Sequence, residues 1–174
     1  MHVSLARRAL FTGRISAPTV LPVRPPWALD EPAFLDACTR CDACLSACDE
    51  GIVARGEGGY PTITFKNGEC TFCGACQSAC EDGALAAVDP QSPPWDLVAR
   101  IDPGCLSANG VTCRVCGDRC DARAIRFQLA VGGIANPVID AAACTGCGAC
   151  VQPCPAAVIS IEHQDHHKAE EASL

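Results

Sequence analysis

The chain has 174 residues and a formal net charge of −7, and aromatic side chains make up only 5% of it. This length suits one or two small domains. So few aromatic residues provide little material for an apolar core, and the fold therefore needs support from cross-links or metal. The acidic charge argues against nucleic-acid binding, and no stretch approaches the ~18–20 apolar residues that a transmembrane helix requires.

The basic N-terminal segment, residues 1–29, contains four arginines and no acidic residue. Ser4 can cap a short helix that stops before Gly13. A helix of this length is not stable alone, so it is either disordered or ordered by a partner. We predict partner docking, because the segment is basic where the rest of the chain is acidic and because the prolines within 18–26 make a stiff spacer.

An export signal is the alternative interpretation of the same segment, since two adjacent arginines near its start superficially resemble a twin-arginine signal. Such a signal needs an apolar h-region of about 7–15 residues. Gly13, Arg14 and several prolines interrupt the segment instead. We therefore expect a cytoplasmic protein, in a compartment that keeps cysteines reduced.

Short helices and strands are predicted over the rest of the chain. Asp30 is suited to cap a helix that runs into Cys38, and brief helical turns are expected over Cys76–Cys80 and Cys150–Cys154. The polar residues 163–174, with three histidines, are predicted to be a disordered tail without a fixed metal site. Short β-rich runs predict hairpin strands over residues 62–65, 85–88, 125–129 and 158–161.

Sixteen cysteines fall into four spaced quartets. Three have the spacing C-x2-C-x2-C-x3-C, and the third quartet has a longer first gap. This spacing is typical of the bacterial ferredoxin run, whose thiolates hold [4Fe–4S] clusters, so four quartets predict four clusters. The quartets are Cys38, Cys41, Cys44 and Cys48; Cys70, Cys73, Cys76 and Cys80; Cys105, Cys113, Cys116 and Cys120; and Cys144, Cys147, Cys150 and Cys154.

Disulfides and zinc are the rival uses of so many cysteines. A disulfide scaffold is suggested by the cysteine content alone, but it does not require the same C-x2-C-x2-C triplet again and again. Zinc sites favour two distant C-x2-C pairs rather than triplets. In a chain with a thin core the clusters would also act as the structural support, because metal binding contributes directly to folding.

The chain repeats itself, which indicates a tandem duplication. Each half reads Pro-Pro-Trp, quartet, strand-like run, Gly-Gly, quartet, with matching offsets: Gly58-Gly59 precedes Cys70 as Gly132-Gly133 precedes Cys144. The predicted fold class is α+β and loop-rich, with tandem bacterial-type 2[4Fe–4S] ferredoxin-like modules of short hairpin strands and short helices. The predicted divisions are 1–29, 30–92, 93–162 and 163–174.

The fourth cysteine of a ferredoxin run serves the neighbouring cluster, so the quartets have to be paired. They can be paired sequentially, first with second and third with fourth, or in a nested way, first with fourth and second with third. The duplication favours sequential pairing, because each half is then a complete two-cluster module. The expected ligand sets are Cys38, Cys41, Cys44 and Cys80; Cys70, Cys73, Cys76 and Cys48; Cys105, Cys113, Cys116 and Cys154; and Cys144, Cys147, Cys150 and Cys120.

Several motifs along nearly the whole chain resemble the NapF family, ferredoxin-type proteins encoded with periplasmic nitrate reductases. The seven-residue gap between Cys105 and Cys113 is the most particular of them. The chain departs from the family at Glu81, where many members have a proline. The other motifs are Arg7-Arg8, Thr12-Gly13-Arg14, Arg24-Pro25-Pro26-Trp27, the run from Cys38 to Cys44, Gly58-Gly59-Tyr60-Pro61 and Phe65-Lys66-Asn67.

The resemblance implies a cytoplasmic four-cluster protein that acts on NapA, the catalytic subunit of the nitrate reductase, before NapA is exported. The implied role is maturation of that precursor. A relay subunit of a respiratory complex and a free soluble ferredoxin are the alternatives. Catalysis by the chain itself is not expected, because no catalytic constellation or nucleotide-binding loop stands out and every cysteine is already assigned to a cluster.

Overall fold

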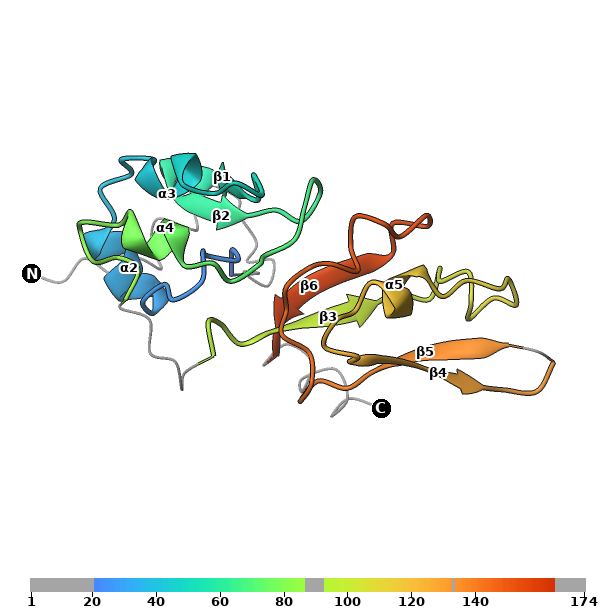
Figure 1. Cartoon of the computed structure of the whole chain (residues 1–174). Helices are drawn as coiled ribbons and strands as arrows, with labels where there is room; N and C mark the ends of the chain where they lie inside the picture. Colours follow the sequence, from blue (N-terminus) through green and yellow to red (C-terminus); the bar gives the residue numbers. More distant parts are fainter. Residues whose placement is uncertain (1–20, 87–92, 133, 165–174) are drawn as a thin grey trace, which may run out of the picture.

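The computed structural model describes residues 21–86, 93–132 and 134–164. Figure 1 shows two groups of elements, one built from residues 21–86 and one from residues 93–164, which we call the first half and the second half. The helix predicted from Ser4 and the tail beyond residue 164, with His166 and His167, lie outside the described residues. No helix in the described part of the chain is long and apolar enough to cross a membrane.

The first half begins with helix α2 (Glu31–Ala37), which carries the fully buried Phe34. The predicted helix is confirmed and ends directly before Cys38, but Asp30 makes no side-chain capping bond. Pro32 supplies the preset helical backbone at the start instead. Two one-turn helices, a 3-10 turn and a hairpin complete this half: α3 (Ala43–Ser46), α4 (Ala75–Ser78), η1 (Glu57–Gly59), β1 (Val53–Arg55) and β2 (Pro61–Ile63).

The second half contains two antiparallel strand pairs and one short helix (Figure 1). Strand β3 (Leu97–Ile101) pairs with β6 (Ile159–His163), and β4 (Ile125–Leu129) pairs with β5 (Ala135–Ile139). Helix α5 (Val115–Asp118) packs near β4. The fold is thus α+β, with small sheets and long loops, as the sequence predicts.

The two halves share one plan. In each, an inner hairpin lies between the two quartets, β1 with β2 and β4 with β5. In each half, the segment after Pro-Pro-Trp pairs with the segment that follows the second of that half's two quartets. That outer pairing is a single bridge between Ala28 and Leu85 in the first half and the full β3–β6 pair in the second.

Three predicted details are wrong. The segment at 158–161 is not a hairpin strand, because as part of β6 it pairs with the distant β3. His163, which the sequence assigns to a disordered tail, ends β6 and bonds Asp96 at 2.7 Å. Residues 150–154 form turns rather than a helix.

Proline explains the last difference. In the second quartet the amide of Ala79 donates to Ala75 O at 3.1 Å and closes the helical turn of α4. The equivalent residue in the fourth quartet is Pro153, which has no amide hydrogen to donate. The turn therefore forms only hydrogen bonds that span three residues, such as the one from Val151 N to Gly148 O at 2.9 Å.

The core consists of three apolar clusters, and each of them includes cysteines. Phe34 is a buried member of the first cluster, Ile52 and Phe65 are buried in the second, and Ala99 and Ile159 are buried in the third. Because the strands are short and the apolar side chains pack around thiols, the stability of this core depends on what the thiols bind.

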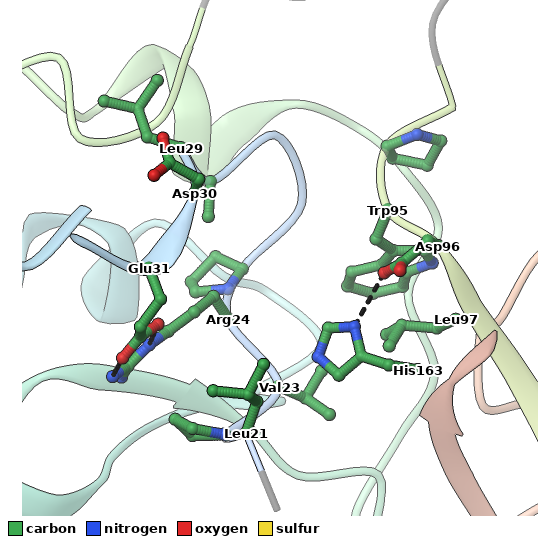
Figure 2. Close-up of a pocket in the computed structure, with 14 residues that line it drawn as sticks. Leu21, Val23, Arg24, Leu29, Asp30, Glu31, Trp95, Asp96, Leu97 and His163 are labelled. Carbon is green, nitrogen blue, oxygen red and sulfur yellow. Dashed lines mark hydrogen bonds and ion pairs between the residues drawn. The ribbon is translucent and has the colours of Figure 1, made fainter. Parts of the chain in front are cut away.

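A cavity of about 250 Å³ lies between segments of the two halves (Figure 2). On one side Arg24 pairs with Glu31 at 2.6 Å and stacks over Phe34 at 4.8 Å, which fixes the entry into α2. On the other side His163 bonds Asp96. The first pair joins the segment before α2 to its first turn, and the second joins the end of β6 to the residue just before β3.

Candidate metal centres

Three cavities are each lined by four cysteines. The first cavity is lined by Cys38, Cys41, Cys44 and Cys80. The second is lined by Cys48, Cys70, Cys73 and Cys76. The third is lined by Cys105, Cys113, Cys116 and Cys154. In each cavity, the last cysteine of one quartet lies with the first three of its neighbour.

The remaining four cysteines all belong to the second half, and three of them take part in one apolar cluster. Cys150 is buried with Cys116 in an apolar cluster against which Cys120, Cys144 and Cys154 pack. Cys144 and Cys147 are close enough to Cys150 to influence its ionisation. We call Cys120, Cys144, Cys147 and Cys150 the fourth set.

Left-handed turns shape three of the four loops. The residues on either side of the second cysteine both have positive φ angles: 61° and 63° at Arg40 and Asp42, and 55° and 76° at Phe72 and Gly74. The fourth quartet has Gly146 and Gly148 at these positions, at 68° and 81°. Such turns cost roughly 1–2 kcal/mol at non-glycine residues.

These turns favour an anionic ligand. Turns of this kind can gather backbone N–H groups into a concavity that binds anions, iron–sulfur clusters among them. A bound anion would thus offset the cost of the positive φ angles at Arg40, Asp42 and Phe72. The third quartet differs, because Arg114 has a φ of −134° in its helix-capping position, so its longer first gap corresponds to a different loop conformation.

Burial keeps several of the thiols protonated before any metal binds. It raises the pKa of Cys44 and of Cys116 to about 11, and that of Cys70 and of Cys150 to about 12. Neighbouring thiols that would also become negative raise these pKa values further. Ligation therefore has to displace protons, although backbone hydrogen bonds to these cysteines lower their pKa values and partly offset the effect of burial.

Trp27 provides a further observation at the second cavity. Its Nε1 is buried and has no hydrogen-bond partner in the described part of the chain, although Trp27 lines the same cavity as Cys70. The equivalent Trp95 Nε1 donates to Thr145 O at 2.8 Å. An unpartnered N–H is costly unless something fills the cavity and accepts it, and cluster sulfurs do accept such bonds.

Substituting Trp27→Phe should lower the reduction potential of the cluster in the second cavity. An N–H bond to sulfur stabilises the more negative, reduced state, and losing about 1 kcal/mol corresponds to roughly 40 mV for one electron. Potentiometric titration followed by EPR measures the shift. Trp95→Phe is the matched control, since its Nε1 is already bonded within the protein. Equal shifts in both variants, or none, would refute this role for Trp27.

The rival uses of the cysteines find no support in the structure. All sixteen cysteines are described, and all are free thiols. Among residues 21–86, 93–132 and 134–164, no three His, Cys, Asp or Glu side chains are placed to hold a single metal ion. Four cysteines around one wider cavity suit a cube with one thiolate at each iron, and not a zinc ion about 2.3 Å from every sulfur.

Comparisons with known proteins agree with this chemistry. The 4Fe-4S dicluster domain family matches residues 30–85, and a 4Fe-4S binding domain family matches residues 135–156. The chain is therefore a ferredoxin-type iron–sulfur protein, an electron carrier that binds [4Fe–4S] clusters.

The relatives define its family. The ferredoxin-type protein NapF of Escherichia coli K12 is 42% identical over 96% of this chain and 100% of its own length. NapF of Haemophilus influenzae is 42% identical over 91% of this chain and 94% of its own. The chain belongs to the NapF family. It is also similar to the methylamine utilization ferredoxin-type protein MauM of Paracoccus denitrificans, 35% identical over 76% of this chain and 66% of that protein.

Proposed function

We propose that the chain carries four [4Fe–4S] clusters, one in each of the three cavities and one in the fourth set. The observation that carries this proposal is the exchange of the last cysteine between neighbouring quartets. Cys80 lies in the first cavity and Cys48 in the second, which is the arrangement of two-cluster ferredoxins.

Each half then acts as one two-cluster module. The first half pairs the first two quartets and the second half pairs the last two. The third cavity supports this division, because Cys154 lines it together with Cys105. The shared plan of inner hairpin and outer pairing is also what a tandem duplication produces.

We further propose that the protein acts in the cytoplasm on the precursor of the nitrate reductase catalytic subunit, NapA, and assists its maturation before export. The family supports this assignment, and free thiols throughout the chain suit a reducing compartment. The basic segment 1–29 is the docking element, since it opposes in charge an otherwise acidic chain.

Deleting residues 1–14 should abolish association with the NapA precursor while leaving the iron content and visible spectrum unchanged. The deleted residues contain no cysteine, so no cluster ligand is lost. Co-purification from anaerobic cytoplasm with a tagged NapA precursor measures the association, and we expect at least a tenfold loss.

Deleting residues 166–174 is the matched control, because it also removes a terminal stretch without cysteine. It should leave the association intact. If the deletion of 1–14 leaves the association unchanged, docking lies on the cluster-bearing body. A relay subunit or a free ferredoxin would fail to co-purify with the NapA precursor even at full length.

A further inference from the structure

The two halves touch through two of their cysteine loops. The amide of Cys70, in the second quartet, donates to the carbonyl oxygen of Cys147, in the fourth, at 2.8 Å. Both residues belong to cluster-binding triplets. Their sulfurs are thus joined by the few covalent bonds within each cysteine and by one hydrogen bond.

Close packing holds these loops together. The ring of Phe65, from the first half, lies so tightly on Gly148 that a Cβ there would come 2.0 Å from the ring. Phe65 is 8% exposed, and Val151 and Ile161 of the second half pack against its apolar cluster. The glycine at 148 therefore serves the contact between halves as well as the left-handed turn.

Further contacts surround the same junction. Trp95 lies edge-on to Phe65 at 6.2 Å and to Phe72 at 5.6 Å. Arg119, beside Cys120, pairs with Glu69, beside Cys70, at 3.7 Å. Figure 1 shows the loop after β2 reaching toward the half that carries β6.

The first and third cavities are each lined by one half alone, as the second cavity is, and the second quartet is set apart by the hydrogen bond from Cys70 to Cys147. Every residue that lines the first cavity comes from the first half, between Phe34 and Leu85. Every residue that lines the third cavity comes from the second half, between Ile101 and Ile159. Neither cavity includes a residue from the opposite half.

We propose that the four sites form one row for electron transfer, and that the contact between Cys70 and Cys147 is its crossing point. The order is first cavity, second cavity, fourth set, third cavity. Electrons can then pass through all four sites between the first cavity and the third, so the two halves do not act as independent ferredoxins. This inference rests on the proposed four-cluster function.

Each step along the row moves one electron and no atoms. The reduced centre gives up one electron and is oxidised by one, its neighbour is reduced by one, and no bond is made or broken. An external one-electron reductant supplies the first electron; in the experiment below it is dithionite. The hydrogen bond joins the two cysteine loops directly, and Trp95 packs against Phe65 and Phe72 beside it.

Magnetic coupling between the two central sites tests the row. A full-length variant is made in which only the second cavity and the fourth set retain all four cysteines. It carries the substitutions Cys38→Ala, Cys41→Ala, Cys105→Ala and Cys113→Ala. After anaerobic reduction with dithionite, its EPR spectrum should show splitting from spin–spin interaction. The matched control keeps the first cavity and the fourth set, through Cys70→Ala, Cys73→Ala, Cys105→Ala and Cys113→Ala, and its spectrum should lack that splitting.

A spectrum of two uncoupled centres in the first variant, with its iron retained, would overturn the row while leaving the four-cluster proposal standing. Coupling only in the control would overturn the order. If the variants lose their iron, iron positions from anomalous scattering of the unmodified holoprotein decide. The closest pair between halves should be the clusters of Cys70 and Cys147, and any other closest pair refutes the inference. Fewer than four iron centres would instead refute the proposed function.

Discussion

Removing iron with a chelator under anaerobic conditions should unfold the protein and not merely bleach it. All three apolar side-chain clusters of the core include cysteines. The described strands are only three to five residues long. Structural zinc in small peptides contributes about 10–16 kcal/mol on binding, and whole domains are stable by only about 5–15 kcal/mol. Losing the clusters thus removes a contribution comparable to the entire stability.

Far-UV circular dichroism and limited proteolysis, followed together with visible absorption, measure this collapse. The absorbance and the protease resistance should fall in parallel. Reconstitution with iron and sulfide is the control, and it should restore both signals. An apoprotein that stays folded and resistant to protease would show that the apolar core suffices without clusters.

Substituting Cys80→Ala should destroy or damage the cluster of Cys38, Cys41 and Cys44, and not that of its own quartet. Double variants reveal which cluster is lost, because two changes at one site are not additive. Cys80→Ala with Cys38→Ala should lose no more iron than either alone, about four irons. Cys80→Ala with Cys73→Ala should lose about eight, two clusters' worth.

The opposite result has an equally clear meaning. If Cys80→Ala and Cys73→Ala together cost only one cluster, the last cysteine serves its own quartet. Iron and acid-labile sulfide analysis of anaerobically purified protein measures the loss, against about sixteen irons in the unmodified chain. Cys48→Ala with Cys70→Ala provides the reciprocal pair, and it should also cost a single cluster.

Local patterns in the sequence predict the cysteine loops well. In the first two quartets the spacing places three thiols around one cavity, because two intervening residues allow only a tight loop. The duplication then favours the sequential pairing, and the structure groups Cys80 with Cys38 and Cys48 with Cys70. The run at 125–129 likewise predicts β4, which has the same bounds.

Features that depend on distant partners were not predicted. Strand β3 becomes a strand by pairing with β6 at the other end of the second half, and no local signal marks its partner. Strand β5 contains Pro137, which demotes a run from the strand assignment. The sheet tolerates it because both strands of a two-stranded sheet are edges, where a missing N–H can face solvent.

The junction between the halves was also beyond sequence reasoning. Gly148 is a left-handed residue of a cysteine loop, and Phe65 is one apolar residue in a strand-like run. Their contact depends on how the two halves dock, which is a matter of three-dimensional packing. The repeat predicts that two similar halves exist, and it contains no information on which faces meet.

The pairing of β3 with β6 also determines when the second half can close during synthesis. The two strands stand at opposite ends of that half, so every residue between them has to be synthesised before β6 can reach β3. Closing so long a loop is a slow, late event in folding. Cys154 of the third cavity is synthesised shortly before β6. A nascent chain that has not reached residue 154 therefore lacks one of the four thiols of the third cavity, although the other three have already been made.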